Sequence, residues 1–150
     1  YARHIGQLNV LTSLIEHGDS NVGNFLISRA EEGARVFSID NGVAFAFNES
    51  DRGKLWQDLR ADRLPADTVE RLRGITEDEL HRRLGVLAQW QLQDGRWVAV
   101  PPGKNLGPGR GVRREGDTVQ VGLTKPEVAD VGRNLRRLLK DLDSGKIKTF

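Results

Sequence analysis

The sequence predicts a mainly helical α+β fold in a single domain. Apolar residues recur at helical spacing in several segments, two short apolar runs flank a turn near the N-terminus, and a glycine- and proline-rich stretch with strand-like ends interrupts the second half. The 150 residues, 37% of them hydrophobic, can bury roughly two-thirds of their unfolded surface, which is enough for one core. We therefore expect one domain over 1–150.

The chain begins with a predicted helix that reaches about Glu16, because its apolar residues fall at helical spacing: Ile5, Leu8, Leu11 and Leu14. The first residue is Tyr1 and not methionine, and the helical pattern starts almost at once. We therefore expect that the sequence begins inside a domain and not at its first residue. After the His17-Gly18 break, the runs NFLIS and RVFSI are separated by a turn that contains Gly33, so residues 24–40 predict a β-hairpin.

The remaining elements follow from patterning and capping. A helical body is predicted over 51–93, a hairpin or flap over 95–123 with strand-like pieces at 97–100 and 118–121, and a C-terminal helix over 124–143. The tetrads TEDE at 76–79 and TKPE at 124–127 match a capping box, and helices of roughly 15 residues are expected after each. The last helix pairs a leucine stripe with a basic face, which is typical of amphipathic packing.

Composition narrows the function classes. The formal net charge is +2, from 23 basic and 21 acidic residues, which is too small to indicate nucleic acid as a partner by itself. The absence of cysteine excludes disulfide scaffolds and thiolate chemistry, and it fits a cytoplasmic protein while leaving the secretory pathway open. No apolar run reaches the ~18 to 20 residues of a membrane span, so no transmembrane segment is expected.

Two short segments carry the candidate chemistry. HGDSNVGN at 17–24 places Asp19 and Asn24 in a loop before the first strand, and Asp40 ends the second strand, directly before Asn41 and Gly42. A hairpin brings its ends together, so Asp19, Asn24 and Asp40 are expected to converge. Carboxylate and amide oxygens suit Mg²⁺, and phosphoryl transfer needs such ligands beside a carboxylate that positions the acceptor hydroxyl. Zinc is disfavoured, because the three histidines lack paired ligand spacing.

These two segments resemble the catalytic and metal-binding loops of the protein-kinase-like superfamily. HGDSNVGN fits the His-x-Asp-x₄-Asn pattern of aminoglycoside phosphotransferases and small-molecule kinases. IDNG, followed by alanine and phenylalanine, is similar to phosphatidylinositol 3- and 4-kinase-like proteins and to secretory-pathway kinases. The resemblance covers residues 5–47 and implies a kinase-like C-terminal lobe with catalytic and metal loops within 14–47.

The resemblance also implies residue roles and cofactors. Asp19 would be the catalytic aspartate, Asn24 and Asp40 would bind Mg²⁺ and the ATP phosphates, His17 would shape the catalytic loop, and Gly42 would allow the turn after the metal ligand. The acceptor would be a hydroxyl of a lipid, a protein or a small molecule. Such enzymes carry a nucleotide-binding N-terminal lobe before the catalytic loop, and no counterpart precedes Tyr1, so this chain alone is expected to be inactive.

Other interpretations stay open. Asp19, Asn24 and Asp40 are also ordinary turn residues. A non-catalytic pseudokinase or nucleotide-binding scaffold is the main alternative function, and nucleic-acid binding through the basic last third is a third. The other conspicuous side chains are interpreted as structural. The three tryptophans are expected to pack in the core or in a hairpin, and Arg110, Arg113 and Arg114 are expected to lie in a solvated flap.

Overall fold

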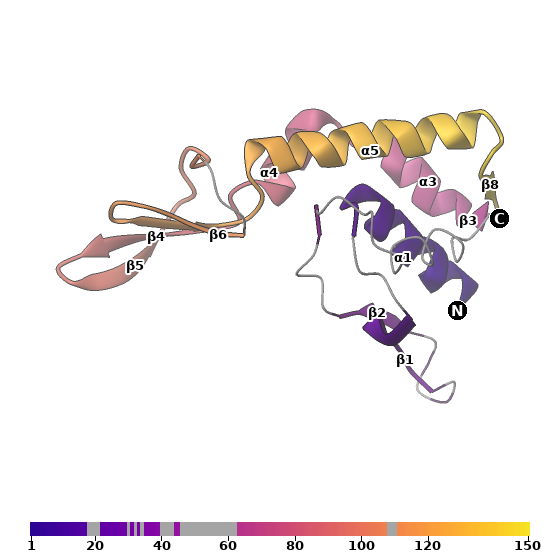
Figure 1. Ribbon diagram of the computed structural model, residues 1–150, viewed down its shortest axis with the longest axis horizontal. Helices are drawn as coiled ribbons and strands as arrows, with labels where there is room; N and C mark the ends of the chain where they lie inside the picture. The colour runs from indigo at the N-terminus through magenta and orange to yellow at the C-terminus, as the bar shows by residue number, and fades with distance from the viewer. Residues whose placement is uncertain are drawn as a thin grey trace. The chain divides into compact units, whose positions relative to one another are not determined.

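The computed structural model describes residues 1–17, 22–29, 31, 33, 35–39, 44–45, 63–107 and 111–150 (Figure 1). Its contacts divide the chain into two compact units. The first unit comprises Tyr1–Gly74 with Arg133–Phe150, and the second comprises Ile75–Gly132. Helices and strands occur in both, so the predicted α+β class is confirmed. That the chain forms one kinase-like domain stays a prediction.

The first unit begins with helix α1 (Ala2–Leu14), as predicted. The helix buries one face, on which Leu8 and Val10 are 8% and 6% exposed. Gly6 lies on this face because space is tight there: a Cβ at this position would be 3.0 Å from Cδ of Pro65. The helix ends where Glu16 adopts a left-handed backbone with φ 45°, an uncommon conformation for a residue with a side chain.

A short antiparallel hairpin follows α1, which confirms the predicted one. A 3₁₀ turn (η1, Val22–Asn24) leads into β1 (Phe25–Ile27), and β1 pairs with β2 (Val36–Ser38). Leu26 lies opposite Phe37 at the centre of the pairing.

The rest of the first unit packs around its leucines and valines. Helix α3 (Ala66–Arg73) and the C-terminal part of α5 (Lys125–Asp143) supply most of them, and β3 (Arg63–Leu64) pairs in parallel with β8 (Lys148–Thr149). The buried apolar residues of this unit are Leu8, Val10, Leu64, Val69, Leu72, Leu135 and Leu138. Leu135 and Leu138 belong to the predicted apolar stripe of the last helix.

The second unit contains helix α4 (Glu77–Leu84) and a four-stranded antiparallel sheet in the order β5-β4-β7-β6. The strands are β4 (Ala88–Gln93), β5 (Arg96–Val100), β6 (Val112–Glu115) and β7 (Thr118–Val121). The prediction of a helical body to residue 93 is therefore wrong over 88–93. The run AQWQLQ alternates polar and apolar residues with the period of a strand, and a two-residue Asp94-Gly95 turn with φ 48° and 76° closes a type I′ hairpin.

The predicted flap over 95–123 also needs correction. Its two strand-like pieces are strands, but they do not pair with each other: β5 pairs with β4, and β7 lies between β4 and β6. The sheet thus consists of two hairpins, β4–β5 and β6–β7, whose inner strands pair. Because paired residues share a face, the three glutamines of β4 lie on one face and Trp90 and Leu92 on the other, together with Trp97.

Arg113 differs most from its expected environment. It was predicted in a solvated flap, yet it is 2% exposed and its Nη1 donates to the carbonyl of Gly122. Its neighbour Arg114 points to the opposite face, where its guanidinium lies 5.2 Å from the ring centroid of Trp97. Trp97, predicted as a core or hairpin-packing aromatic, is 43% exposed and has this arginine beside its ring, while Trp56 and Arg110 lie outside the described residues.

Both predicted capping boxes occupy helix starts. At α5, Thr124 Oγ1 accepts from Glu127 N at 3.3 Å and Glu127 Oε2 accepts from Thr124 N at 2.8 Å, so both halves form. At α4, Thr76 Oγ1 accepts from Glu79 N at 3.2 Å. Helix α4 has 8 residues and α5 has 19, against the roughly 15 expected for each. Within the described ranges no helix is both long and apolar enough to cross a membrane.

Candidate functional site

The candidate site is built from the two segments that the sequence singled out, both in the first unit. His17 and Asn24 are among the described residues, and Asp19, Asp40 and Gly42 lie outside them. What the structure gives is the backbone at the ends of both segments.

The first segment follows the end of helix α1, which hydrogen bonds hold in place. Two backbone hydrogen bonds hold the chain after α1: Ile15 N donates to Leu11 O at 3.1 Å, and His17 N donates to Thr12 O at 3.1 Å. The carbonyl of Leu14 accepts from Nδ2 of Asn134, which lies on α5 and is 5% exposed. The direction in which the chain enters HGDSNVGN is therefore fixed by a helix from the far end of the sequence.

His17 is almost completely buried, with 2% of its surface exposed. A proton carrier in catalysis must reach its substrate, and a side chain this buried has little contact with solvent. The burial therefore favours the role in shaping the loop, which is the one that the resemblance implied.

A backbone hydrogen bond joins the last residue of the first segment to the second segment. Ile39 N donates to Asn24 O at 2.9 Å, and this bond continues the pairing of β1 with β2 by one step. Asp40 is the next residue after Ile39 in the sequence. The hairpin therefore brings Asn24 and Ile39 together. The convergence of Asp19, Asn24 and Asp40 stays a prediction, because Asp19 and Asp40 lie outside the described residues.

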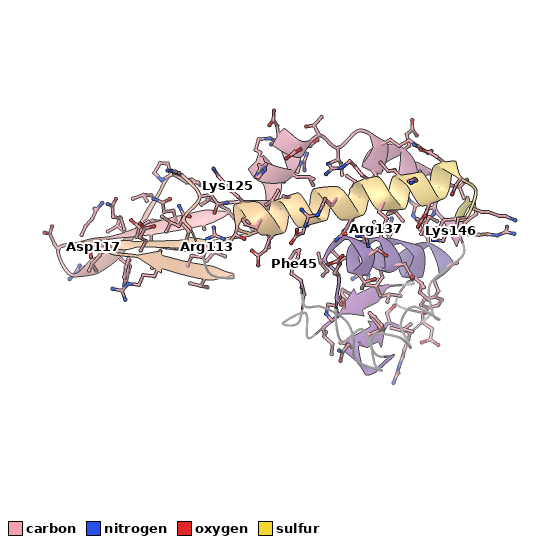
Figure 2. All side chains as sticks on the ribbon, turned by 45° about the horizontal axis from the view of Figure 1, so that its top comes forward. Phe45, Arg113, Asp117, Lys125, Arg137 and Lys146 are labelled. Atoms are coloured by element: carbon pink, nitrogen blue, oxygen red, sulfur yellow. The ribbon has the colours of Figure 1, made fainter. Side chains whose placement is uncertain are left out.

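A second backbone bond joins the other two ends. Phe45 N donates to Ile15 O at 2.7 Å, so the end of the second segment meets the residue two positions before His17. Figure 2 labels Phe45 on the chain beyond β2. Residues 15–24 and 39–45 are thus tied to each other at both ends, and each stretch spans only a few residues between its ties.

The backbone at these ties is unusual. Three described residues other than glycine have positive φ, and two of them, Glu16 with φ 45° and Phe45 with φ 59°, flank the two segments. The third, Asp94, belongs to the hairpin turn of the second unit. Residues held in the left-handed region cost free energy and concentrate at functional sites, where the surrounding structure imposes them.

An ion pair lies beside the end of α1. Arg137 of α5, labelled in Figure 2, lies 3.8 Å from Oε1 of Glu16. Both side chains are substantially exposed, so the pair contributes little to stability. No three His, Asp or Glu side chains of the described ranges gather as possible metal ligands. Asp19 and Asp40 do not belong to those ranges.

The second unit contains a separate depression of about 540 Å³, formed by α4, the start of α5 and the segment after β5. Its lining mixes charges of both signs and comprises Asp78, His81, Arg82, Val86, Pro102, Gly103, Asn105 and Lys125. Arg82 is also within 3.5 Å of Glu79 on its own helix. The lining contains neither of the two motifs, and its opposing charges do not define one class of ligand.

The sequence reasoning missed the residues that support the site from a distance. Asn134 is buried in the apolar stripe of α5, and its position there was the available signal, since a buried amide needs a partner. No comparable signal marks Phe45. Comparisons with family models, curated proteins and solved structures give no match.

Proposed function

We propose that this chain is the catalytic lobe of an ATP- and Mg²⁺-dependent phosphotransferase that acts on a hydroxyl group. One observation supports the proposal most strongly. The two segments that resemble kinase loops are joined by backbone hydrogen bonds at both ends, Asn24 O to Ile39 N and Ile15 O to Phe45 N. The first of these bonds extends the β1–β2 hairpin, and the second joins the two segments outside the hairpin.

The residue types fit the chemistry of the proposed reaction. The acceptor hydroxyl oxygen attacks the γ-phosphorus of ATP, the bond to the β-phosphate oxygen breaks, ADP leaves, and Asp19 orients the hydroxyl and accepts its proton. The amide oxygen of Asn24 and the carboxylate of Asp40 are hard ligands of the kind that Mg²⁺ prefers. When bound, Mg²⁺ neutralises charge on the phosphates.

Two further residues have supporting roles. His17, the buried first residue of the first segment, holds the loop, and Gly42 supplies a permissive backbone after the metal ligand. Because the resemblance puts the nucleotide-covering loop and its lysine in a separate N-terminal lobe, binding is the property to measure on this chain, and turnover on a protein that includes that lobe.

Calorimetric titration with ATP and Mg²⁺ tests the proposal on this chain. We expect binding that requires Mg²⁺ in the wild type and loss of that binding in Asp40→Asn, with the fold verified by circular dichroism. Asp94→Asn is the matched control, because it makes the same chemical change in an exposed turn of the second unit, where asparagine tolerates the positive φ. Equal binding by both variants would show that Asp40 does not hold the metal.

The role of Asp19 needs a separate readout. In a protein that includes the N-terminal lobe, Asp19→Asn should keep Mg²⁺-dependent ATP binding and lose phosphoryl transfer, because the side chain positions the acceptor and not the nucleotide. Unchanged transfer would refute this role. Nucleotide binding without transfer in the wild-type longer protein would instead favour the pseudokinase alternative.

A further inference from the structure

The sheet of the second unit has two outer strands, β5 and β6, and each has a strand neighbour on one side among the described residues (Figure 1). An outer strand presents unpaired N–H and C=O groups that can pair with another chain. Folded proteins usually protect such edges with charged residues, proline or bulges. The two edges of this sheet differ in that respect.

Strand β6 is protected and β5 is not. Three of the four residues of β6 are charged, and antiparallel pairing of β6 with a second β6 about a two-fold axis at either arginine would place that arginine opposite its own equivalent. Like charges in directly opposite positions are destabilising. Strand β5 has the sequence RWVAV, with one charge at its first position, and its Trp97 and Val98 are 43% and 41% exposed.

The register of the β4–β5 hairpin shows which backbone groups form the free edge. In a type I′ hairpin with a two-residue turn, the flanking residues Gln93 and Arg96 form a hydrogen-bonded pair, and such pairs alternate with non-bonded ones along the ladder. Trp97 and Ala99 therefore direct their N–H and C=O groups away from β4. Leu92, opposite Trp97, supports this alternation, because its N–H donates to a residue on the β7 side at 2.8 Å.

We propose that β5 pairs in antiparallel fashion with β5 of a second copy of this chain, about a two-fold axis at Val98. In this register Trp97 of each copy faces Ala99 of the other, and the free groups of both residues exchange hydrogen bonds on each side of the axis. A large side chain then meets a small one. Arg96 faces Val100, so no like charges oppose each other, and Val98 meets its own equivalent.

The same features limit the assembly to two chains. Pro101 directly follows β5 and cannot donate a backbone hydrogen bond, so the pairing ends there. The charged edge of β6 does not offer a second site of the same kind. A two-fold contact between identical strands therefore closes on itself, and the two sheets join into one.

Sedimentation equilibrium over protein concentrations from about 1 µM to about 1 mM tests the pairing. We expect the wild type to approach twice the 16.7 kDa of one chain. Val98→Lys and Val98→Asp should each weaken the dimer at least about tenfold, because each puts two like charges together at the axis. Mixed in equal amounts, the two variants should restore a dimer, since lysine then faces aspartate.

Gln93→Glu is the control, since it adds the same charge as Val98→Asp to the same sheet face on β4, opposite Arg96 and away from the axis. It should leave the dimer unchanged. A wild type that stays monomeric throughout would overturn the proposal and leave an extended segment of another protein as the occupant of this edge. A dimer that persists unweakened in both Val98 variants would also overturn it, because the contact would then lie elsewhere.

Discussion

Replacing Gln120 with leucine should destabilise the second unit although the two side chains are similar in size. Gln120 is 1% exposed, and its side chain connects the sheet to the segment after β5. Nε2 donates to Gln89 Oε1 at 2.7 Å and to Lys104 O at 2.9 Å, and Oε1 accepts from Leu106 N at 3.0 Å. Gln89 Oε1 also accepts from Gly103 N at 2.8 Å, so two glutamines hold the whole segment.

The expected loss of stability follows from the three hydrogen bonds of the Gln120 side chain. A typical intramolecular hydrogen bond contributes about 1 kcal/mol net, and a buried partner left unsatisfied costs about 1 to 3 kcal/mol. The segment can partly open to water, which relieves some of that penalty. We therefore expect Gln120→Leu to lower the free energy of unfolding by about 2 to 4 kcal/mol. Gln120→Glu distinguishes the effect of side-chain shape from the effect of the hydrogen bonds. It keeps the shape and the acceptor for Leu106 N–H but loses both donated bonds.

Urea denaturation gives the global change, and hydrogen exchange of the Leu106 amide gives the local one. Gln91→Leu is the control, since Gln91 is an exposed glutamine on the same face of the sheet, and its effect should stay within about 0.5 kcal/mol. A Gln120→Leu protein as stable as this control, with its Leu106 amide still protected, would refute the argument that the glutamine holds the segment.

Three further perturbations test other parts of the fold. Gly122→Ala should unfold the second unit as judged by circular dichroism, since φ is 138° and a Cβ there would lie 1.6 Å from a carbonyl oxygen after α4. Asn134→Ala should cost about 1 to 3 kcal/mol in urea denaturation, because Leu14 O loses a buried donor. The hydrogen bond from Arg3 lowers the pKa of Asp67, so Asp67 favours folding above its ordinary pKa of 3.8 and this contribution fades as the pH falls below it. Arg3→Ala should raise that pKa toward 3.8 in an NMR titration.

Local patterns predicted the elements whose signals lie close together in sequence. Both capping boxes start helices, because the threonine and the glutamate act across a single turn. The hairpin of β1 and β2 followed from two apolar runs and the turn between them. Such signals depend on neighbours only a few residues away, so a single sequence contains them.

The helical prediction over 88–93 is wrong because that segment contains a strand signal. AQWQLQ has the period of a strand, and Asp94-Gly95 is a hairpin turn. The burial of Arg113 has a different cause. Alternation along β6 places Arg113 and Arg114 on opposite faces, but only the tertiary structure determines which face the segment after β5 covers.

The candidate site combines both kinds of information. The sequence predicted the residue types of the site. It also predicted that Asn24 lies close to the start of IDNG, because a hairpin brings its own ends together. The bond from Phe45 to Ile15 and the support of Leu14 by Asn134, 120 positions away, were not predicted, since no local pattern encodes them. It follows that the first segment depends on α5 for its position. A kinase-like site in this chain therefore requires the C-terminal helix as well as the motifs, and removing that helix should disturb the loops even though it contains none of their residues.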